Sequence, residues 1–392
     1  MESAGSSFWV AGLVVLGLAV GVRAGDDDTA ESQQLPYDAH EVVFASVSDG
    51  VDDEHVVLAG TLVVPTQERT PDQEADSHED DAGFPAVVFL TGSGAQDRDE
   101  TIFGHKPFAV IADHLARRGF ASLRFDDRGV GGSGGVLTDT TVEELAGDAI
   151  GAVRFLLKNN AIDPDRIVIL GHSEGGLIGA ITAAKLGDRC AGLVMLSGPG
   201  YRGRDILLQQ TQSMMRAAGI GESIIEKQSE LHTALMDLIE SGADEQTVKS
   251  GIERLARAQM GLPEDGDIPE PQQNVVERVV NQQGKMVLSR WFQSFAFYDP
   301  GEALKEVTCP VLALGGKLDL QVLAEKNLGR IEHLLHEAGN DDVSIQVFDG
   351  LNHMFQPATT GLVNEYAQIQ ITIAPEVLDT LGNWLVKHLK VR

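Results

Sequence analysis

Residues 166–180 read RIVILGHSEGGLIGA: an apolar run, a cluster of glycines around one serine, and then a second apolar run. The centre of this segment, GHSEG at 171–175, matches the pattern G-x-S-x-G, in which a sharp turn between a strand and a helix exposes a serine hydroxyl. The run that ends at Leu170 has the length of a buried strand, and a helix is expected to begin directly after Ser173. Flanking glycines remove the β-carbons that would collide in such a turn. The segment therefore predicts a nucleophilic serine, Ser173, at the end of a strand.

A second match to the same pattern, GGSGG at residues 131–135, contains Ser133. Ser133 lies eight residues beyond Phe125, where a predicted strand ends, and the next helix is expected only near Thr141. A hydroxyl in the middle of a glycine-rich loop lacks the strand-to-helix turn that the pattern requires. Of the two serines, we therefore predict that Ser173 is the nucleophile.

The loop around Ser133 also carries the spacing of a dinucleotide-binding fingerprint, G-x-G-x-x-G at residues 129–134. That fingerprint turns directly from strand into helix, so that the helix N-terminus receives the pyrophosphate. Here the sequence DDR separates the strand from the glycines, and the carboxylates of Asp126 and Asp127 would repel a phosphate. We therefore predict a structural loop and no bound cofactor.

From residue 84 onward, short apolar strands alternate with amphipathic helices. The runs at 84–90, 120–125 and 166–170 are strand-like, and the segments between them repeat apolar residues at helical spacing. This alternation predicts an α/β fold with a mostly parallel central sheet flanked by helices, whose reactive loops lie at the carboxyl ends of the strands. Two earlier runs, at 40–47 and 55–65, are expected to form a strand pair that opens the fold.

Residues 201–306 interrupt this alternation with helical segments and no convincing strand. They hold five of the eight methionines, whose flexible side chains suit an adaptable apolar surface. We predict a helical cap, or lid, over this range. The α/β core is then divided into a first part over residues 36–200 and a second part over residues 307–392.

The composition excludes several classes of protein. The 43% apolar content is that of a packed globule, and 59 acidic against 30 basic side chains give a formal charge of −29. That charge opposes binding to nucleic acids and to anionic membrane surfaces.

His333 and His336 have the spacing of one helix face, but no third ligand stands near them in the sequence, so no metal site is predicted.

The N-terminus carries an apolar run over residues 8–22, which is too short for a comfortable membrane span but suits the core of a signal peptide. Small residues precede a cleavage site after Ala24, although no Lys or Arg stands before the apolar run. We predict a signal peptide over residues 1–24 and a flexible acidic lead over 25–35. The expected location is periplasmic or extracellular, with no stable membrane partner after cleavage. A tethered N-terminus and a cytoplasmic protein are the alternatives.

A serine hydroxyl becomes a nucleophile when a histidine accepts its proton and an acid orients that histidine. Where a serine stands on a strand-to-helix elbow, the acid and then the histidine follow on loops after later strands. Asp319 follows the strand-like run VLALGG, and His353 follows SIQVFDG. Asp349, four residues before His353, and Asp299, at the exit of the predicted cap, are rival acids. We predict that Ser173, Asp319 and His353 act together.

The tetrahedral intermediate of acyl transfer also needs backbone N–H donors for its oxyanion. We expect one from Glu174, directly after the nucleophile, and one from Ser93 or Gly94, in the loop after the strand FPAVVFL. Ser93 is a poor candidate for the nucleophile because no helix follows it closely. The charged run at 96–100 is expected to form a salt-bridged rim, in which Arg98 could recognise a substrate carboxylate.

The chain has two cysteines, Cys190 and Cys309, which excludes a disulfide-rich framework and a multi-cysteine metal site. Each stands at the start of a predicted strand, CAGLVMLSG or CPVLALGG. If these strands are neighbours in the sheet, the two sulfur atoms lie near the same edge and an exported protein could join them. Two buried free thiols are the alternative.

The segments LAGTLVVP, FLTGSGAQDRDE, FDDRGVGGSGG, GHSEGGL, CPVLALGGKLDLQV and LNHMFQ follow one another in the chain. Together they resemble the α/β-hydrolase superfamily, and within it bacterial esterase-like proteins of the dienelactone-hydrolase and serine-aminopeptidase neighbourhood. The resemblance covers roughly residues 40–390. It implies the α/β-hydrolase fold with a helical cap between the sixth and seventh core strands, and a carboxylesterase with Ser173, Asp319 and His353 as its triad. Gly316 stands where relatives often carry a charged residue.

The sequence thus predicts a serine hydrolase that cleaves carboxylic esters of small molecules through an acyl-enzyme, with no cofactor and no metal. An aminopeptidase or amidase, and a thioesterase or acyltransferase, would use the same triad and are alternatives. A non-catalytic binding protein on a hydrolase scaffold is a further alternative. The acyl group, the alcohol and the oligomeric state stay open.

Overall fold

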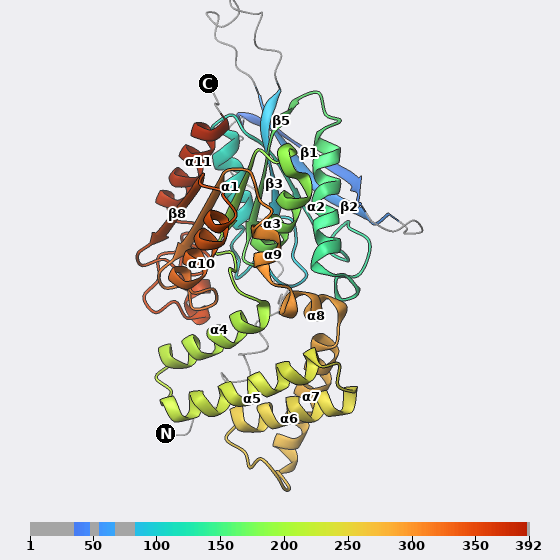
Figure 1. Ribbon diagram of the computed structural model, residues 1–392, viewed down its shortest axis with the longest axis vertical. Coiled ribbons are helices and arrows are strands. Elements are labelled where there is room, and N and C mark those ends of the chain that lie inside the picture. Colours follow the sequence, from blue (N-terminus) through green and yellow to red (C-terminus); the bar gives the residue numbers. More distant parts are fainter. Residues whose placement is uncertain (1–34, 48–54, 67–82, 390–392) are drawn as a thin grey trace, which may run out of the picture.

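An eight-stranded sheet forms the centre of the molecule, with the strand order β1-β2-β4-β3-β5-β6-β7-β8 (Figure 1). It is seen in a computed structural model that describes residues 35–47, 55–66 and 83–389. The predicted signal peptide and all but the last residue of the acidic lead lie outside the described residues. The strands are β1 (Tyr37–Ala45), β2 (Val57–Pro65), β3 (Phe84–Leu90), β4 (Ala121–Phe125), β5 (Ile162–His172), β6 (Gly192–Leu196), β7 (Val311–Gly316) and β8 (Val343–Phe348).

The sheet is mostly parallel, as the alternation of strands and helices predicts. β1 pairs with β2 and β2 pairs with β4 in antiparallel fashion, whereas β4, β3, β5, β6, β7 and β8 are all parallel. The expected strand pair at the start of the fold is confirmed, because β1 and β2 pair from Tyr37 with Pro65 to Ala45 with Val57. β5 is longer than the run 166–170 and ends at His172, immediately before the serine.

Helices cover both faces of the sheet because successive side chains of a strand point to opposite sides. On one face, α1 (Pro107–Ala116) and α11 (Pro375–Leu389) pack on residues such as Phe89 and Leu170. On the other, α2 (Val142–Leu156), α3 (Glu174–Leu186) and α10 (Ala324–Glu337) pack on residues such as Val88 and Ile169. The two faces therefore bury two separate apolar clusters, which is the α/β sandwich that the sequence predicts.

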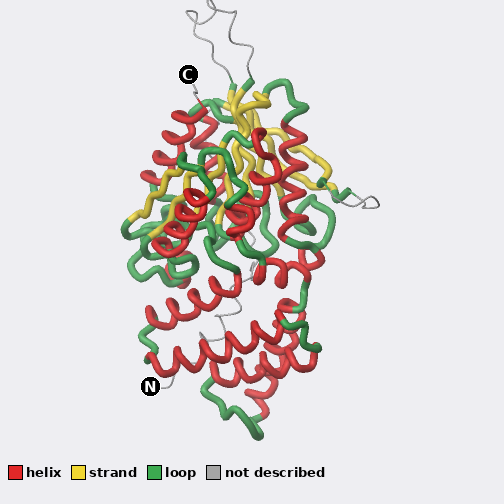
Figure 2. Tube along the Cα trace, in the orientation of Figure 1, coloured by secondary structure: helices red, strands yellow, loops and turns green. Residues whose placement is uncertain are grey.

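The chain between β6 and β7 forms helices joined by loops over residues 203–304, with no strand. Helices α4 to α8 gather at one end of the molecule, away from the strands, as Figures 1 and 2 show. The short α9 returns to the core, where it packs against α3 and α10. The helices are α4 (Gly203–Ala217), α5 (Glu222–Glu240), α6 (Glu245–Gln259), α7 (Glu270–Val287), α8 (Arg290–Phe297) and α9 (Pro300–Leu304).

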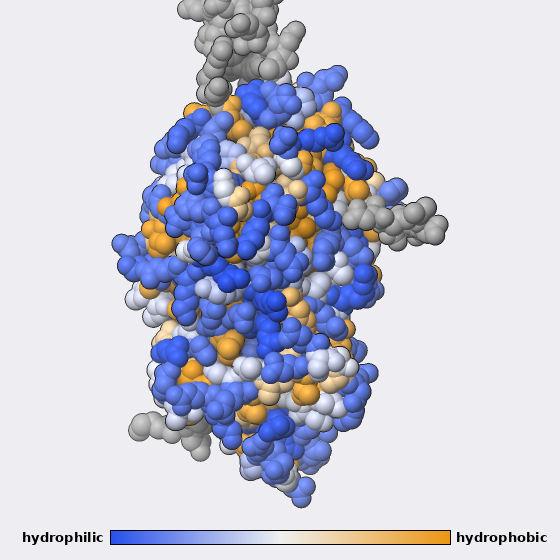
Figure 3. Space-filling view, in the orientation of Figure 1, coloured by the Kyte–Doolittle hydropathy of each residue, from blue (hydrophilic) through white to orange (hydrophobic). Residues whose placement is uncertain are grey.

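Polar side chains dominate the face drawn in Figure 3, with apolar residues scattered between them. Within the described ranges, no helix has the length and apolar character needed to cross a membrane.

Candidate active site

Ser173 stands in the strained turn that its sequence motif predicts. It lies between the end of β5 and the start of α3 with φ 54° and ψ −122°, a left-handed φ that is costly for a serine. A β-carbon added to Gly171 would lie 1.9 Å from the carbonyl oxygen of Gly175, and one added to Gly175 would lie 2.2 Å from that of Leu90. Positions 171 and 175 must therefore both be glycine. The turn between them holds Ser173 at the carboxyl end of β5.

Ser133 has a different environment. Its hydroxyl accepts the N–H of Ala59 at 2.9 Å and donates to the carbonyl oxygen of Asp126 at 2.7 Å. The side chain is buried and ties the glycine-rich loop to β2. Because these backbone groups engage the hydroxyl, Ser133 has the surroundings of a structural residue, in keeping with the sequence argument.

Asp319 and His353 meet at the ends of neighbouring strands. Asp319 follows β7 and His353 follows β8, and the Asp319 Oδ2 atom lies 2.8 Å from the His353 Nδ1 atom. The other carboxylate oxygen of Asp319 accepts the N–H groups of Gln321 and Val322, each at 2.8 Å. The Asp319 side chain is fully buried, and three hydrogen bonds fix its orientation.

The rival acids are engaged elsewhere. Asp349 is exposed and pairs with Lys317 at 3.0 Å. Asp299 caps α9 through the N–H of Gly301 at 2.9 Å and faces Arg330 at 3.4 Å. Of the three carboxylates considered in the sequence, the structure brings Asp319 to the histidine.

The loop after β3 approaches Ser173 from the other side of β5 than the loops after β7 and β8. A β-carbon added to Gly92 would lie 3.3 Å from the Ser173 Cβ atom, so this loop passes directly over the elbow. Asp127 holds the loop in place by accepting the Thr91 hydroxyl at 2.7 Å and the Gln96 N–H at 2.8 Å. Ser93 and Gly94 follow Gly92, where backbone N–H groups can face an oxyanion.

Glu174 is the first residue of α3, and its backbone N–H is one of the donors that the helix leaves free. Its carboxyl group is buried and accepts the indole N–H of Trp291, from α8, at 2.9 Å. Burial raises the pKa of Glu174 to about 7, although hydrogen bonds from Ser93 and Trp291 act in the opposite direction. An acid that titrates near neutral pH therefore stands beside the expected oxyanion site.

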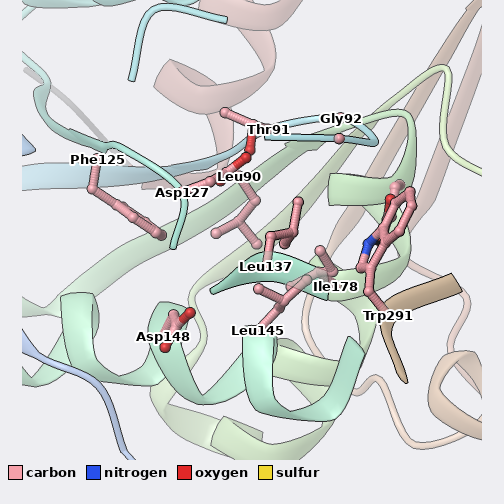
Figure 4. Close-up of a pocket in the computed structure, with 12 residues that line it drawn as sticks. Leu90, Thr91, Gly92, Phe125, Asp127, Leu137, Leu145, Asp148, Ile178 and Trp291 are labelled. Atoms are coloured by element: carbon pink, nitrogen blue, oxygen red, sulfur yellow. Dashed lines mark hydrogen bonds between the residues drawn. The ribbon is translucent and has the colours of Figure 1, made fainter. Parts of the chain in front are cut away.

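A narrow cavity of about 20 Å³, room for roughly one water molecule, lies beside Glu174. Figure 4 shows Thr91 and Gly92 on one side of it and Trp291 with Ile178 on another. Neither Ser173 nor His353 lines it. The cavity therefore borders the loop after β3 and Glu174 but does not reach the serine or the histidine. The lining residues are Leu90, Thr91, Gly92, Gly94, Phe125, Asp127, Leu137, Leu145, Asp148, Glu174, Ile178 and Trp291.

The charged run at 96–100 is only partly the rim that the sequence predicts. Arg98 does form ion pairs, with Glu41 at 2.5 Å and with Asp126 at 2.8 Å. Because these carboxylates engage its guanidinium group, Arg98 is not placed to bind the carboxylate of a substrate. Glu100, however, is buried and lies 2.8 Å from the Nδ1 atom of His172. The interpretation of Glu100 as a rim residue is wrong, because the loop turns inward at this point with a left-handed φ of 53°.

Sequence reasoning missed three side chains at this site: Glu100, His172 and Trp291. The only sequence signal for His172 was its place inside the serine motif. No sequence signal pointed to Trp291, because its partner Glu174 lies 117 residues away in the chain. In the described part of the chain, no group of His, Cys, Asp and Glu side chains could hold a metal ion.

Comparison with known proteins agrees with the fold. A family model described as serine aminopeptidase, S33, matches residues 106–247. Esterase EstD of Thermotoga maritima is 27% identical over 305 residues, which are 78% of this chain. The matched region spans 62% of EstD, less than two thirds of its length.

Solved structures of low sequence identity share the architecture. The esterase Pf2001 of Pyrococcus furiosus has a TM-score of 0.50 at 15% identity, with 94% of this chain and 98% of that chain covered. The α/β hydrolase GrgF of Penicillium sp. sh18 has a TM-score of 0.51 at 16% identity, with 91% and 100% covered. With the parallel sheet and the serine elbow already in place, these matches show that the chain has the α/β-hydrolase fold. In sequence it is similar to the esterase EstD and, over residues 106–247, to the serine aminopeptidase family.

Proposed function

We propose that this protein hydrolyses carboxylic esters of small molecules through an acyl-enzyme. The observation that carries the proposal is the placement of a strained serine, at the end of β5, on the sheet edge where a buried Asp319–His353 pair also lies. Because Asp319 engages Nδ1 of His353, Nε2 is the nitrogen left to accept the Ser173 proton. The similarity to EstD supports an ester rather than another acyl compound.

In the proposed reaction, the Ser173 oxygen attacks the ester carbonyl while His353 accepts its proton. The N–H groups of Glu174 and of Ser93 or Gly94 stabilise the negative charge that develops on the carbonyl oxygen. His353 then gives its proton to the leaving alcohol, and the acyl group stays on Ser173. Water, activated by His353, attacks this acyl-enzyme and releases the acid and the free serine.

The test compares Ser173→Ala with Ser133→Ala on a small chromogenic acyl ester. Loss of the nucleophile is expected to lower kcat/KM by at least about 10³-fold. Ser133→Ala should retain most of the activity, because its hydroxyl bonds only to backbone groups. The reverse result would falsify the assignment of Ser173.

Amide hydrolysis is the second candidate, because the matching family model is described as a serine aminopeptidase. A panel of aryl esters and aminoacyl amides, assayed with wild type and Ser173→Ala, separates the two activities. Hydrolysis of the amides with a kcat/KM above that of the esters would favour the peptidase alternative.

We also propose that the protein is exported, on the strength of the apolar run over residues 8–22. N-terminal sequencing of the mature protein from its native host should find a chain that begins after Ala24. A chain that keeps residues 1–24 would contradict export by cleavage.

A further inference from the structure

A buried carboxylate links the loop after β3 to the serine elbow. The Glu100 Oε1 atom accepts the N–H of Gly92 at 2.7 Å and lies 2.8 Å from Nδ1 of His172. The two side chains are only 5% and 7% exposed. Neither belongs to the proposed triad, yet Gly92 directly precedes Ser93 and His172 directly precedes Ser173.

The other nitrogen of His172 reaches the third loop of the site. Nε2 lies 3.1 Å from the backbone carbonyl oxygen of His353, and the Ser197 hydroxyl donates to the same oxygen at 3.3 Å. A carbonyl oxygen only accepts, so Nε2 of His172 must carry a proton. The rings of His172 and His353 lie 4.7 Å apart, which places the two histidines against each other.

The protonation of His172 follows from its partners. Burial alone would lower the pKa of His172, but the charge and hydrogen bond of Glu100, the His353 carbonyl and the charge of Asp319 together raise it. With Nε2 donating to His353, an ionised Glu100 at Nδ1 makes the ring an imidazolium. A positive ring beside a negative carboxylate leaves neither charge buried alone, while the Glu100 Oε2 atom is buried without a hydrogen-bond partner.

We propose that Glu100 and His172 form a buried ion pair that positions the oxyanion loop and His353 around Ser173. The inference rests on the proposed function. Glu100 contacts Gly92, the residue before Ser93, and His172 contacts the backbone of His353. His172 is itself the residue before Ser173. A shift of the pair would therefore move all three loops. Glu100, Ser173 and Ser197 all have left-handed φ values, of 53°, 54° and 49°. Such strain persists only where surrounding contacts over-determine the backbone.

The first test uses Glu100→Gln, which keeps the shape and the acceptor oxygen but removes the charge. Misplacement by about 1 Å can cost about 10²-fold in rate, so we expect kcat to fall roughly 10- to 100-fold with KM little changed. Glu100→Ala, which also loses the acceptor for Gly92, should fall further. Glu226→Gln, an exposed glutamate of α5, is the matched control and should behave as wild type.

A pH profile distinguishes positioning from mere loss of stability. The titratable groups around the His172 ring are Glu100, Asp319 and His353. In Glu100→Gln, His172 loses the carboxylate that raises its pKa, so the ring gives up its second proton at a lower pH than in wild type. The rate deficit of Glu100→Gln should therefore grow as the pH rises, whereas a purely structural role predicts the same deficit at every pH.

The ion pair can be observed without any substrate. Imidazole NMR of the folded protein should show that His172 stays protonated at both nitrogens to a higher pH in wild type than in Glu100→Gln. A neutral His172 in wild type, or wild-type kcat and pH profile in folded Glu100→Gln and Glu100→Ala, overturns the proposal. If instead the proposed ester hydrolysis is wrong, wild type and Ser173→Ala will be equally inactive on every ester. The NMR measurement would still decide whether Glu100 and His172 form an ion pair.

Discussion

Glu174 combines two functions that make it sensitive to pH at the scale of a single residue. Its N–H is a proposed oxyanion donor, and its buried carboxyl group has a pKa raised to about 7 from an ordinary value of 4.5. Between these two values, the folded protein keeps a proton that the unfolded chain releases. Raising the pH through this window therefore lowers the free energy of unfolding, by about 3 kcal/mol in total.

We expect Glu174→Gln to remove this dependence, because an amide cannot ionise. Urea unfolding at pH 5 and at pH 8 should show that the variant is more stable than wild type at pH 8 and nearly equal to it at pH 5. The control Glu226→Gln should follow the wild-type curve. Equal losses of stability for wild type and Glu174→Gln between the two pH values would contradict a raised pKa.

At the same scale, the positions of some residues of the candidate site were predictable and those of others were not. Ser173 could be predicted because the turn that exposes it is local, and two glycines in its own motif make the turn possible. Asp319 and His353 could be predicted because parallel strands bring their carboxyl ends to one edge. Glu100 and His172 could not, since their contact joins residues 72 positions apart and depends on how a loop turns inward.

Helix α8 is the element that joins the helical region to the expected oxyanion site. Trp291 donates to Glu174, while Arg290 pairs with Glu144 at 3.0 Å and Ser294 accepts the N–H of Val142 at 3.0 Å. Both of the latter partners lie in the first turn of α2. The helix is thus anchored to the N-terminal turns of two core helices, α2 and α3.

Trp291→Phe tests this anchor, because it keeps an aromatic ring and removes one hydrogen-bond donor. A donor to an ionised group contributes roughly 1.5–3 kcal/mol, so the variant should lose about that much stability above pH 7 and less below pH 5. In the Glu174→Gln background the same substitution should cost less, which a double-mutant cycle by urea unfolding measures. Equal costs in both backgrounds would show that Trp291 acts through packing alone.

Elements were easier to predict than their ends. The strand-like runs at 84–90 and 120–125 are strands, because near-continuous apolar sequences fit a sheet covered on both faces. β5, by contrast, begins at Ile162, four residues before the apolar run. Its first residues, IDPD, lack a strand pattern, and Ile162 joins the sheet by pairing with Phe84 of β3. Tertiary pairing, not local preference, sets this boundary.

At the scale of the whole molecule, Cys190 and Cys309 bracket the helices between β6 and β7. Their sulfur atoms lie 3.7 Å apart, both are buried, and both are free thiols in this structure. A disulfide between them would close a loop of 119 positions. On the chain-entropy model, such a loop stabilises the folded state by about 5 kcal/mol.

We expect oxidised glutathione to convert the two thiols to a disulfide, with two molecules of reduced glutathione released. Intact mass after denaturing alkylation should then show no modified cysteine until a reductant is added, and Tm should rise. Cys190→Ala is the control and should show no oxidant-dependent rise in Tm. Two alkylated thiols in the oxidant-treated wild type would support the alternative of permanently free, buried cysteines.

The position of the helical region between β6 and β7 also has a consequence for how the chain folds. β6 pairs with β7 from Leu193 with Val311 to Leu196 with Leu314, so the sheet can be completed only after the residues between them have been synthesised. A growing chain therefore presents β6 as an open edge, which is a template for aggregation, until residues beyond 310 leave the ribosome. Asp319 and His353 belong to this last part, so an incomplete chain carries the serine elbow without its proposed acid and base.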